Sequence, residues 1–252
     1  MLNRFTDKTA VVTGGSTGIG YAIAKLLIHE GAKRVYITGR TRETLEIAAS
    51  SLGDKAIYLV CDVSKLSDIE ILKSEIQKRG DKLDIIVANA GVAENNKFGE
   101  TSEEHYTKIF DINVKGVFFT VQTLLSILKD GSSIILIASI VSNKGMPNLS
   151  LYNASKAAVR SFARSFASDL KHRKIRVNAL SPGLTRTPIQ ENGLKMSKEQ
   201  IDALATYAKD AVPLGYIAQP EEIASAALFL ASNDASYVNG IEFDVDGGFA
   251  QV

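Results

Sequence analysis

Hydrophobic residues follow two alternating patterns along this chain. Short runs of Val, Ile, Leu and Ala predict strands at residues 9–14, 34–39, 56–63, 83–88, 133–138, 175–180 and 241–245. Between them, apolar residues recur at helical spacing, which predicts helices at residues 18–30, 42–52, 65–79, 102–128, 151–172 and 220–231. Strands without polar alternation are typical of a sheet that is covered on both faces. The repeated order of strand and helix therefore predicts an α/β fold, a three-layer doubly wound parallel sheet of about seven strands.

One segment, at about residues 188–213, interrupts this alternation. It mixes polar and apolar residues and shows no strand pattern. An insertion after the carboxyl end of a strand is a common place for a substrate lid, and we predict one here. Its apolar side chains either line an apolar pocket or pack the lid onto the body; they are Ile189, Leu194, Met196, Ile201 and Leu204. No Pro- or Gly-rich linker divides residues 1–252, so we predict a single domain.

Composition narrows the function classes without naming one. The 252 residues carry 29 basic and 28 acidic side chains, a net charge of +1 that gives no general attraction to nucleic acid or to an anionic membrane. The apolar runs are shorter than the roughly 20 residues that span a bilayer, and no signal-peptide core precedes the first strand pattern. Cys61 is the single cysteine, which excludes an intrachain disulfide, and its strand pattern favours a core residue over a nucleophile. We expect a cytoplasmic protein.

Glycines gather where the first predicted strand meets the first predicted helix. Residues 13–20 read Thr-Gly-Gly-Ser-Thr-Gly-Ile-Gly. Glycines allow a tight turn and the close approach of a pyrophosphate, and the helix N-terminus adds free N–H groups and a positive dipole end. A plain glycine-rich turn is the alternative, but the place of the motif favours a dinucleotide site. The spacing is Gly-x-x-x-Gly-x-Gly rather than the usual Gly-x-Gly-x-x-Gly.

Basic residues follow the second predicted strand, where an NAD site normally places an acidic residue for the ribose 2′-hydroxyl. Arg40 and Arg42 stand here, and the first carboxylate is Glu43. A guanidinium pairs with a 2′-phosphate through two charge-assisted hydrogen bonds. We therefore predict NADP(H) in preference to NAD(H), although exposed arginines are also common where a helix begins.

Polar and small residues end the third and fourth predicted strands. Asp62 and Val63 could hold the edge of an adenine, and Asp62 could equally cap the next helix. Asn89, Ala90 and Gly91 follow the fourth strand. Small side chains there let a cofactor lie against the backbone, and ordinary turn chemistry is the alternative.

Tyr152 and Lys156 lie four residues apart in a predicted helix, which puts both side chains on one face. An ammonium beside a phenol favours the phenolate, so we expect Lys156 to make Tyr152 a better proton donor and acceptor near neutral pH. Taken alone, the pair fits an amphipathic helix with a Tyr and a Lys at its edge equally well.

All of these motifs together, in this order, resemble the short-chain dehydrogenase/reductase family. The resemblance covers essentially the whole chain. It rests on the glycine turn, Asn89-Ala90-Gly91, Asn113, Ser139, Tyr152, Lys156, Ser181-Pro182-Gly183 and Val245-Asp246-Gly247-Gly248. The run Pro-Glu-Glu-Ile-Ala at residues 220–224, with the C-terminal motif, resembles the 3-oxoacyl-carrier-protein-reductase-like and glucose-dehydrogenase-like branch. The family has a Rossmann fold.

The resemblance implies a role for each catalytic residue. Tyr152 would be the general acid in carbonyl reduction and the base in alcohol oxidation. Lys156 would help Tyr152 and hold the nicotinamide ribose, Ser139 would hydrogen-bond the substrate oxygen, and Asn113 would hold a water that joins Lys156 to solvent. The cofactor contacts that it implies are Gly14, Ser16, Thr17, Gly18, Ile19, Gly20, Arg40, Thr41, Asp62, Val63, Asn89, Ala90, Gly91, Tyr152, Lys156, Pro182, Gly183, Thr185 and Thr187.

Two positions depart from the family pattern in a way that bears on the cofactor. Ala88 stands where Asn is usual, which removes one side-chain hydrogen bond. Thr17 stands where members that prefer NADPH often carry a basic residue, so a 2′-phosphate would depend more on Arg40 and Arg42.

The resemblance also implies partners and a competing function. It implies a homotetramer or homodimer, formed through residues 102–128 and 151–172, with the last strand adding a second interface. The substrate would be a small carbonyl compound or alcohol, with neither nucleic acid nor membrane as a partner. We expect no metal, because His29, His105 and His172 lack ligand spacing. The alternative function is a dinucleotide-binding sensor or scaffold without turnover.

Overall fold

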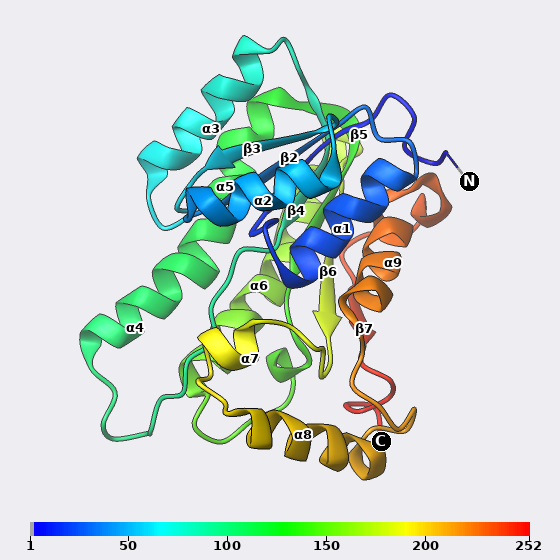
Figure 1. Ribbon diagram of the computed structural model, residues 1–252. Helices are drawn as coiled ribbons and strands as arrows, with labels where there is room; N and C mark the ends of the chain where they lie inside the picture. Colours follow the sequence, from blue (N-terminus) through cyan, green and yellow to red (C-terminus); the bar gives the residue numbers. More distant parts are fainter. Residues whose placement is uncertain (1–2) are drawn as a thin grey trace.

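Seven parallel strands form one sheet in the computed structural model, which describes residues 3–252. They are β1 (Thr9–Thr13), β2 (Arg34–Gly39), β3 (Ala56–Val60), β4 (Leu83–Ala88), β5 (Leu128–Ile137), β6 (Arg176–Pro182) and β7 (Glu242–Val245). Their order across the sheet is β3-β2-β1-β4-β5-β6-β7, as predicted for a doubly wound fold (Figure 1). The order reverses between β1 and β4, and sheets of this kind bind ligands outside the carboxyl ends of the strands at such a point.

Helices cover both faces of the sheet. One face packs against α1 (Gly18–His29), α2 (Arg42–Leu52) and α9 (Pro220–Ala231), and the other against α3 (Leu66–Lys78), α5 (Gly116–Leu124) and α6 (Ser150–Asp169). Each face has its own cluster of buried Val, Ile, Leu and Ala side chains. Because the central strands are buried on both sides, they read as continuous apolar runs in the sequence.

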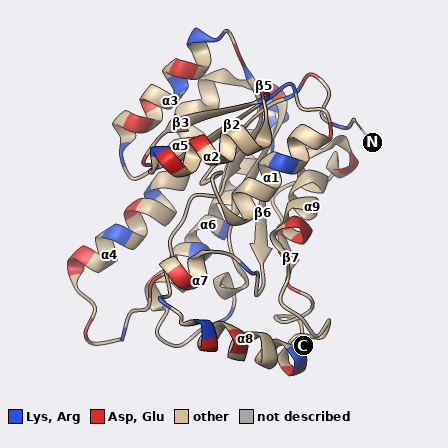
Figure 2. Cartoon of the chain, viewed as in Figure 1, with Lys and Arg blue, Asp and Glu red and all other residues tan. Residues whose placement is uncertain are grey.

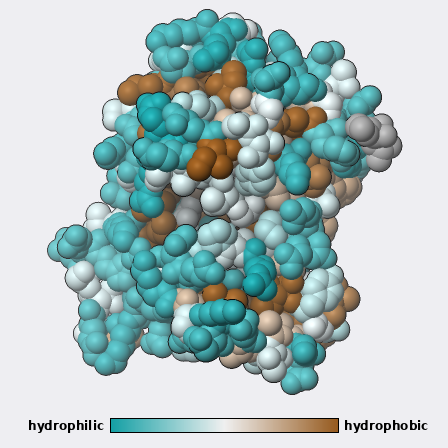
Figure 3. Space-filling view, in the orientation of Figure 1, coloured by the Kyte–Doolittle hydropathy of each residue, from teal (hydrophilic) through white to brown (hydrophobic). Residues whose placement is uncertain are grey.

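Charged residues occur mostly on the helices and loops, while the central strands carry few of them (Figure 2). The face in Figure 3 is mostly hydrophilic, with hydrophobic residues in scattered patches. Within residues 3–252, no helix combines the length and the apolar character that a bilayer crossing requires.

The single helix predicted at residues 102–128 is wrong in one respect, because the structure divides it. It consists of α4 (Glu103–Phe110), a π-helical turn (Asp111–Lys115), α5 and a 3-10 turn (Leu125–Ile127). Periodicity reads this stretch as one helix because the apolar face continues through the wider turn. π-Helical turns are common at functional sites, and this one contains Asn113.

Several other boundaries differ from the prediction by one to five residues, among them those of β3, α3 and β5. β3 ends at Val60, so Cys61, Asp62 and Val63 lie beyond it. Residue Lys65, rather than Asp62, occupies the N-cap of α3; Asp62 instead accepts hydrogen bonds from its own turn. β5 begins five residues earlier than predicted; Lys129, Asp130 and Gly131 are exposed, so this part of the strand lacks the apolar pattern.

The predicted lid contains two helices that the sequence pattern did not indicate, α7 (Ile189–Asn192) and α8 (Lys198–Ala211). A capping box between Ser197 and Gln200 begins α8. Near its other end, Ala208 packs in an apolar cluster with Ile140 and Phe249. The C-terminal end of α8 is therefore anchored beside the short 3-10 turn η3 (Ile140–Ser142), which follows β5.

Candidate active site

A cavity of about 510 Å³ opens at the carboxyl ends of the strands, at the point where the strand order reverses. All the cofactor residues that the sequence predicted line it, except Gly20 and Arg42. Of the four predicted catalytic residues, Ser139, Tyr152 and Lys156 line it and Asn113 does not. Residues from the first 20 positions and from beyond position 180 therefore meet around one cavity.

The glycine turn has a backbone that favours glycine at its critical positions. Gly14 has a φ of 63° and Gly18 a φ of 54°, both in the left-handed region. A Cβ atom on Gly20 would lie 2.3 Å from the carbonyl oxygen of Gly14. Gly20 thus supports the turn from behind, and this is why it does not line the cavity.

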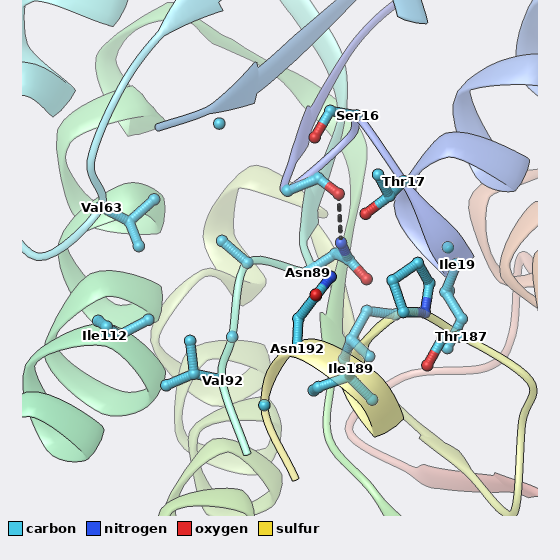
Figure 4. A pocket seen from close by; sticks show the side chains of 18 of the residues that line it. Ser16, Thr17, Ile19, Val63, Asn89, Val92, Ile112, Thr187, Ile189 and Asn192 are labelled. Carbon is cyan, nitrogen blue, oxygen red and sulfur yellow. Dashed lines mark hydrogen bonds between the residues drawn. The ribbon is translucent and has the colours of Figure 1, made fainter. Parts of the chain in front are cut away.

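Asn89 fastens the glycine turn to the end of β4 (Figure 4). Its Nδ2 donates to the carbonyl oxygens of Thr13 at 2.9 Å and Gly14 at 3.0 Å. In return, the Thr13 hydroxyl accepts from the backbone N–H groups of Asn89 and Ala90 at 3.0 Å. These bonds hold the floor of the cavity in one geometry.

The N-terminus of α1 has free N–H groups at the cavity wall. Its N-cap residue, Thr17, makes no side-chain capping bond, and the first turn carries no acidic residue. In contrast, α4 and α8 are capped by Ser102 and Ser197. Uncapped donors with a positive dipole end fit an anionic group such as a pyrophosphate. This chain's own residues therefore fit a dinucleotide at this place.

The two predicted arginines occupy different surroundings. Arg40 is exposed, lines the cavity and makes no ion pair within residues 3–252. Arg42 does not line the cavity, and its guanidinium lies 3.8 Å from the Glu46 carboxylate one helical turn away. Arg40 is therefore the free cation at this end, and the expected contribution of Arg42 finds no support in the geometry.

Asp62 lies on the same side of the cavity. Its Oδ1 accepts from the Ser64 backbone N–H at 3.0 Å and from the Ser64 hydroxyl at 2.7 Å. The Asp62 turn is thus held in place, and the neighbouring Val63 side chain is buried.

Ser139, Tyr152 and Lys156 meet at the opposite end of the cavity. Tyr152 and Lys156 come from the first two turns of α6, and Ser139 follows β5 as the N-cap of η3. A hydrogen bond from Ser139 lowers the pKa of Tyr152, but burial of the phenol outweighs it and raises that pKa to about 12. Tyr152 is therefore protonated at neutral pH, the form that a general acid must have before it acts.

Lys156 is 5% exposed, and its Nζ donates to the carbonyl oxygen of Ile137 at 2.8 Å. Burial lowers the pKa of its ammonium to about 8. The Nζ lies 5.7 Å from the centre of the Tyr152 ring. Desolvation of the phenol is the larger effect on the pKa of Tyr152 in this geometry, and the expected help from Lys156 stays a prediction.

Asn113 acts behind the cavity wall. Its Oδ1 accepts from the Val92 N–H at 2.8 Å, and its Nδ2 donates to the Val92 carbonyl at 2.9 Å and to the Ser155 hydroxyl at 3.0 Å. Both amide hydrogens are used within the protein. The Asn113 amide thus holds the loop after β4 against α6. A water beside Lys156 would have to bond to atoms of Asn113 other than its side-chain amide hydrogens. The water relay stays a prediction.

The segment predicted as a lid, residues 188–213, borders the cavity and lies against its wall at Ala93. Ile189, Asn192 and Gly193 line the cavity (Figure 4 shows the first two). A Cβ atom on Gly193 would lie 2.4 Å from the carbonyl oxygen of Ala93, so lid and wall are in close contact. Of the five apolar lid residues named from the sequence, only Ile189 lines the cavity.

Further lining residues were missed by the sequence analysis, and most of them are neighbours of a motif that it found. Val92 and Glu94 follow Gly91, Ile137 and Ala138 precede Ser139, and the others are Gly39, Thr44, Cys61, Ile112, Pro188, Asn192 and Gly193. The cavity wall includes residues on both sides of each motif, so extending each motif by three residues would have found most of them. Cys61 is a buried core residue, as expected, and burial raises the pKa of its thiol to about 12.

Known proteins similar to this chain are oxidoreductases. Residues 14–250 match the family described as enoyl-(acyl carrier protein) reductase. The oxidoreductase asL5 of Sarocladium schorii is 41% identical, over 100% of this chain and 99% of its own length. An NADP-dependent (R)-specific alcohol dehydrogenase of Lentilactobacillus kefiri is 36% identical, with 99% of both chains covered. The crystal structure of a 3-ketoacyl-(acyl-carrier-protein) reductase from Brucella melitensis, complexed with NADH, superimposes with a TM-score of 0.87 at 33% identity, over 97% of this chain and 99% of that one.

Proposed function

Because this chain belongs to the short-chain dehydrogenase/reductase family, we propose that it is an NADP(H)-preferring carbonyl reductase. The family uses a nicotinamide dinucleotide as cofactor. The substrate would be a ketone or 3-oxoacyl compound, reduced to an alcohol in a reversible reaction. The observation that carries this proposal is the meeting of Ser139, Tyr152 and Lys156 in the same cavity as the glycine turn.

The cofactor would be held mainly by backbone groups. The turn at Gly14 and Gly18, with the uncapped start of α1, would hold the pyrophosphate. Asp62 and Val63 would border the adenine, and Lys156 would hold the nicotinamide ribose. The remaining contacts would come from Ser16, Thr17, Ile19, Thr41, Asn89, Ala90, Gly91, Pro182, Gly183, Thr185 and Thr187. When bound, the cofactor supplies the hydride that a carbonyl reduction requires.

Arg40 supports the preference for NADP(H). It is an exposed guanidinium at the cavity with no carboxylate partner within residues 3–252, and no acidic residue of β2 stands near it to accept from a ribose hydroxyl. A guanidinium is well suited to bind a phosphate through two parallel hydrogen bonds. The relative from Lentilactobacillus kefiri is named as NADP-dependent, which agrees with this proposal.

Tyr152 would donate the proton that the reduced carbonyl oxygen receives. Its raised pKa keeps the phenol protonated until negative charge develops on that oxygen. Ser139 acts on the Tyr152 phenol by lowering its pKa, and it would also stabilise the developing charge on the substrate. Lys156, whose pKa of about 8 keeps it largely charged at pH 7, would stabilise the phenolate that remains.

Assembly through helices α5 and α6 is a second part of the proposal. Phe118, Phe162 and Phe166 form a partly exposed aromatic cluster there, with ring centres 5.3 to 5.7 Å apart. Such a cluster suits a contact between copies of the chain, and we propose a homotetramer or homodimer. Size-exclusion chromatography coupled to light scattering should give the mass of two or four chains. The mass of a single chain would contradict the proposed assembly.

The proposal is tested by following the consumption of NADPH and of NADH at 340 nm with a panel of carbonyl compounds. The panel contains an acetoacetyl thioester, small activated ketones and diketones. We expect turnover with at least one class, and a higher kcat/KM for NADPH than for NADH. Binding of NADPH without turnover of any carbonyl, and without oxidation of any sugar or cyclic alcohol, would instead favour a non-catalytic sensor.

A further inference from the structure

Glu242 of β7 holds a nearly buried carboxylate behind the active site. Its side chain is 10% exposed. One oxygen, Oε1, accepts from the hydroxyls of Ser142 and of Ser181, the latter at 2.7 Å. The other, Oε2, accepts from the Asn143 amide at 2.6 Å and lies 3.7 Å from the Arg160 guanidinium. A single carboxylate therefore contacts four side chains from three other parts of the chain.

Each of these parts carries a residue of the proposed reaction. Ser142 ends the 3-10 turn that begins directly after Ser139. Ser181 directly precedes Pro182 and Gly183, which line the cavity. Because the contacts lie on β6, β7 and the turn after β5, Glu242 fixes the relative positions of three neighbouring segments at the edge of the cavity.

The fourth partner extends this network to α6. Arg160 lies one turn after Lys156 and two turns after Tyr152, on the same helix. Its guanidinium donates to Oδ1 of Asn143, while Nδ2 of Asn143 donates to Glu242. The Asn143 amide is thus bonded on both sides, and the turn that carries Ser139 is tied to the helix that carries Tyr152.

A buried carboxylate is costly to desolvate, and packing alone would be served as well by an apolar side chain. Charge-assisted hydrogen bonds, however, fix distance and direction more strictly than apolar contacts do. Glu242 does not line the cavity that Ser139, Tyr152 and Lys156 line. Its four contacts are accordingly suited to hold other residues in place.

We propose that Glu242 is a positioning residue of the active site, which sets the distance between Ser139 and Tyr152 through the Asn143–Arg160 link. The expected kinetic effects rest on the proposed carbonyl reduction. The claim that Glu242 sets the Ser139–Tyr152 distance does not depend on that reaction. A loosened turn would move Ser139 relative to Tyr152, and small misplacements of reacting groups lower the rate of chemistry more than they lower binding.

Glu242→Gln is the sharpest test, because it keeps the shape of the side chain and changes one oxygen. The amide oxygen can still accept from Ser142 and Ser181, whereas the new NH₂ group faces the amide nitrogen of Asn143 and the Arg160 cation, both of which are donors. We expect kcat to fall about tenfold while the dissociation constant for NADPH changes less than about twofold. Asn143→Ala removes the same link, so the double variant should be no slower than Glu242→Gln alone.

Asp244→Asn is the matched control, since Asp244 lies two residues along the same strand and its pKa is raised by burial and by the nearby Glu242. Within residues 3–252, its carboxylate hydrogen-bonds only Gln251, in the C-terminal tail. We expect this control to keep the wild-type kcat. The inference is overturned if Glu242→Gln keeps full kcat, or if it weakens NADPH binding as much as it lowers kcat.

A readout without turnover separates this inference from the proposed function. In crystal structures of the wild type and of Glu242→Gln, the distance between the Ser139 and Tyr152 hydroxyls should be about 1 Å longer in the variant. If the wild type shows no turnover but Glu242→Gln still lengthens the Ser139–Tyr152 distance, the proposed reaction is rejected and the positioning role is kept. An unchanged contact in the variant would reject the positioning role whatever the reaction.

Discussion

The two ends of the cavity are built from different kinds of groups, one from backbone and the other from side chains. The end at the glycine turn is shaped by backbone: left-handed glycines, uncapped N–H groups and a carbonyl that leaves no room for a Cβ atom at Gly20. The other end is shaped by side chains, with Ser139, Tyr152 and Lys156 in front and the Glu242 network behind them. The first end should therefore suffer when atoms are added, and the second when polar groups are removed.

The largest effect should come from Tyr152→Phe, at the side-chain end. Removal of the phenol hydroxyl takes away the proposed general acid, and such groups contribute on the order of a hundred- to ten-thousandfold to rate. We expect kcat to fall on the order of a thousandfold in the NADPH consumption assay. A variant that retains more than about a tenth of the wild-type kcat would remove Tyr152 from the mechanism.

Gly20→Ala tests the backbone end with one added methyl group. The new Cβ would lie 2.3 Å from the Gly14 carbonyl oxygen and 2.5 Å from the Asn89 amide, so the turn must shift. We expect the dissociation constant for NADPH, measured by fluorescence titration, to rise at least about tenfold.

Gly145→Ala is the control for this substitution, because a Cβ atom on Gly145 would have no neighbouring atom within 4 Å and its φ lies outside the left-handed region. It should leave both NADPH binding and kcat unchanged. If Gly20→Ala bound NADPH as tightly as Gly145→Ala, the glycine turn would not be the cofactor cradle.

Arg40→Ala tests the side-chain contribution at the backbone end of the cavity, which is the proposed preference for NADPH over NADH. Loss of a charged hydrogen-bond donor to a phosphate costs about 1.5–3 kcal/mol, which is about ten- to a hundredfold in the kcat/KM ratio of NADPH to NADH. Arg42→Ala should change that ratio less than about twofold, because Arg42 faces Glu46 and does not line the cavity. Equal effects from the two variants would contradict the assignment of the cofactor preference to Arg40.

The smallest effect should be a gain of stability at the side-chain end. Burial lowers the pKa of Lys156 to about 8, below its value of about 10.4 in an unfolded chain. The unfolded state therefore binds more protons between these two pH values, so this group's contribution to stability rises with pH across that window and opposes folding below it.

Lys156→Met should accordingly increase the free energy of unfolding at pH 7 by about 1 kcal/mol while it abolishes activity. It should also flatten the rise in stability between about pH 8 and pH 10. Urea unfolding at pH 7, 8.5 and 10 measures both effects. A less stable variant with an unchanged pH slope would show that the buried ammonium carries no cost in the folded protein.

The sequence predicted the regular parts of the molecule well, for physical reasons. β2 and β4 and helices α2 and α9 have the predicted bounds, because uniform apolar runs identify buried strands and Pro220 marks the first position of α9. The backbone end of the cavity could also be predicted, because left-handed turns and close backbone approaches favour glycines, which can be recognised in the sequence.

The side-chain end could be predicted only in its reacting residues. The direction of Arg42 and the contacts of Asn113 depend on neighbours that no local pattern specifies. Glu242 read only as part of a strand, because its hydrogen-bond partners Ser181 and Ser142 lie 61 and 100 residues away in the sequence. The lid helices were missed because α7 spans four residues and the apolar positions of α8 are few.

The most direct test of the account measures NADPH binding and NADPH-dependent turnover in the same preparation of Tyr152→Phe. The account predicts a dissociation constant within about twofold of the wild type, together with the loss of nearly all turnover, because the cradle and the proton donor lie at separate ends of one cavity. Turnover near the wild-type rate, or a loss of binding as large as the loss of turnover, would contradict it.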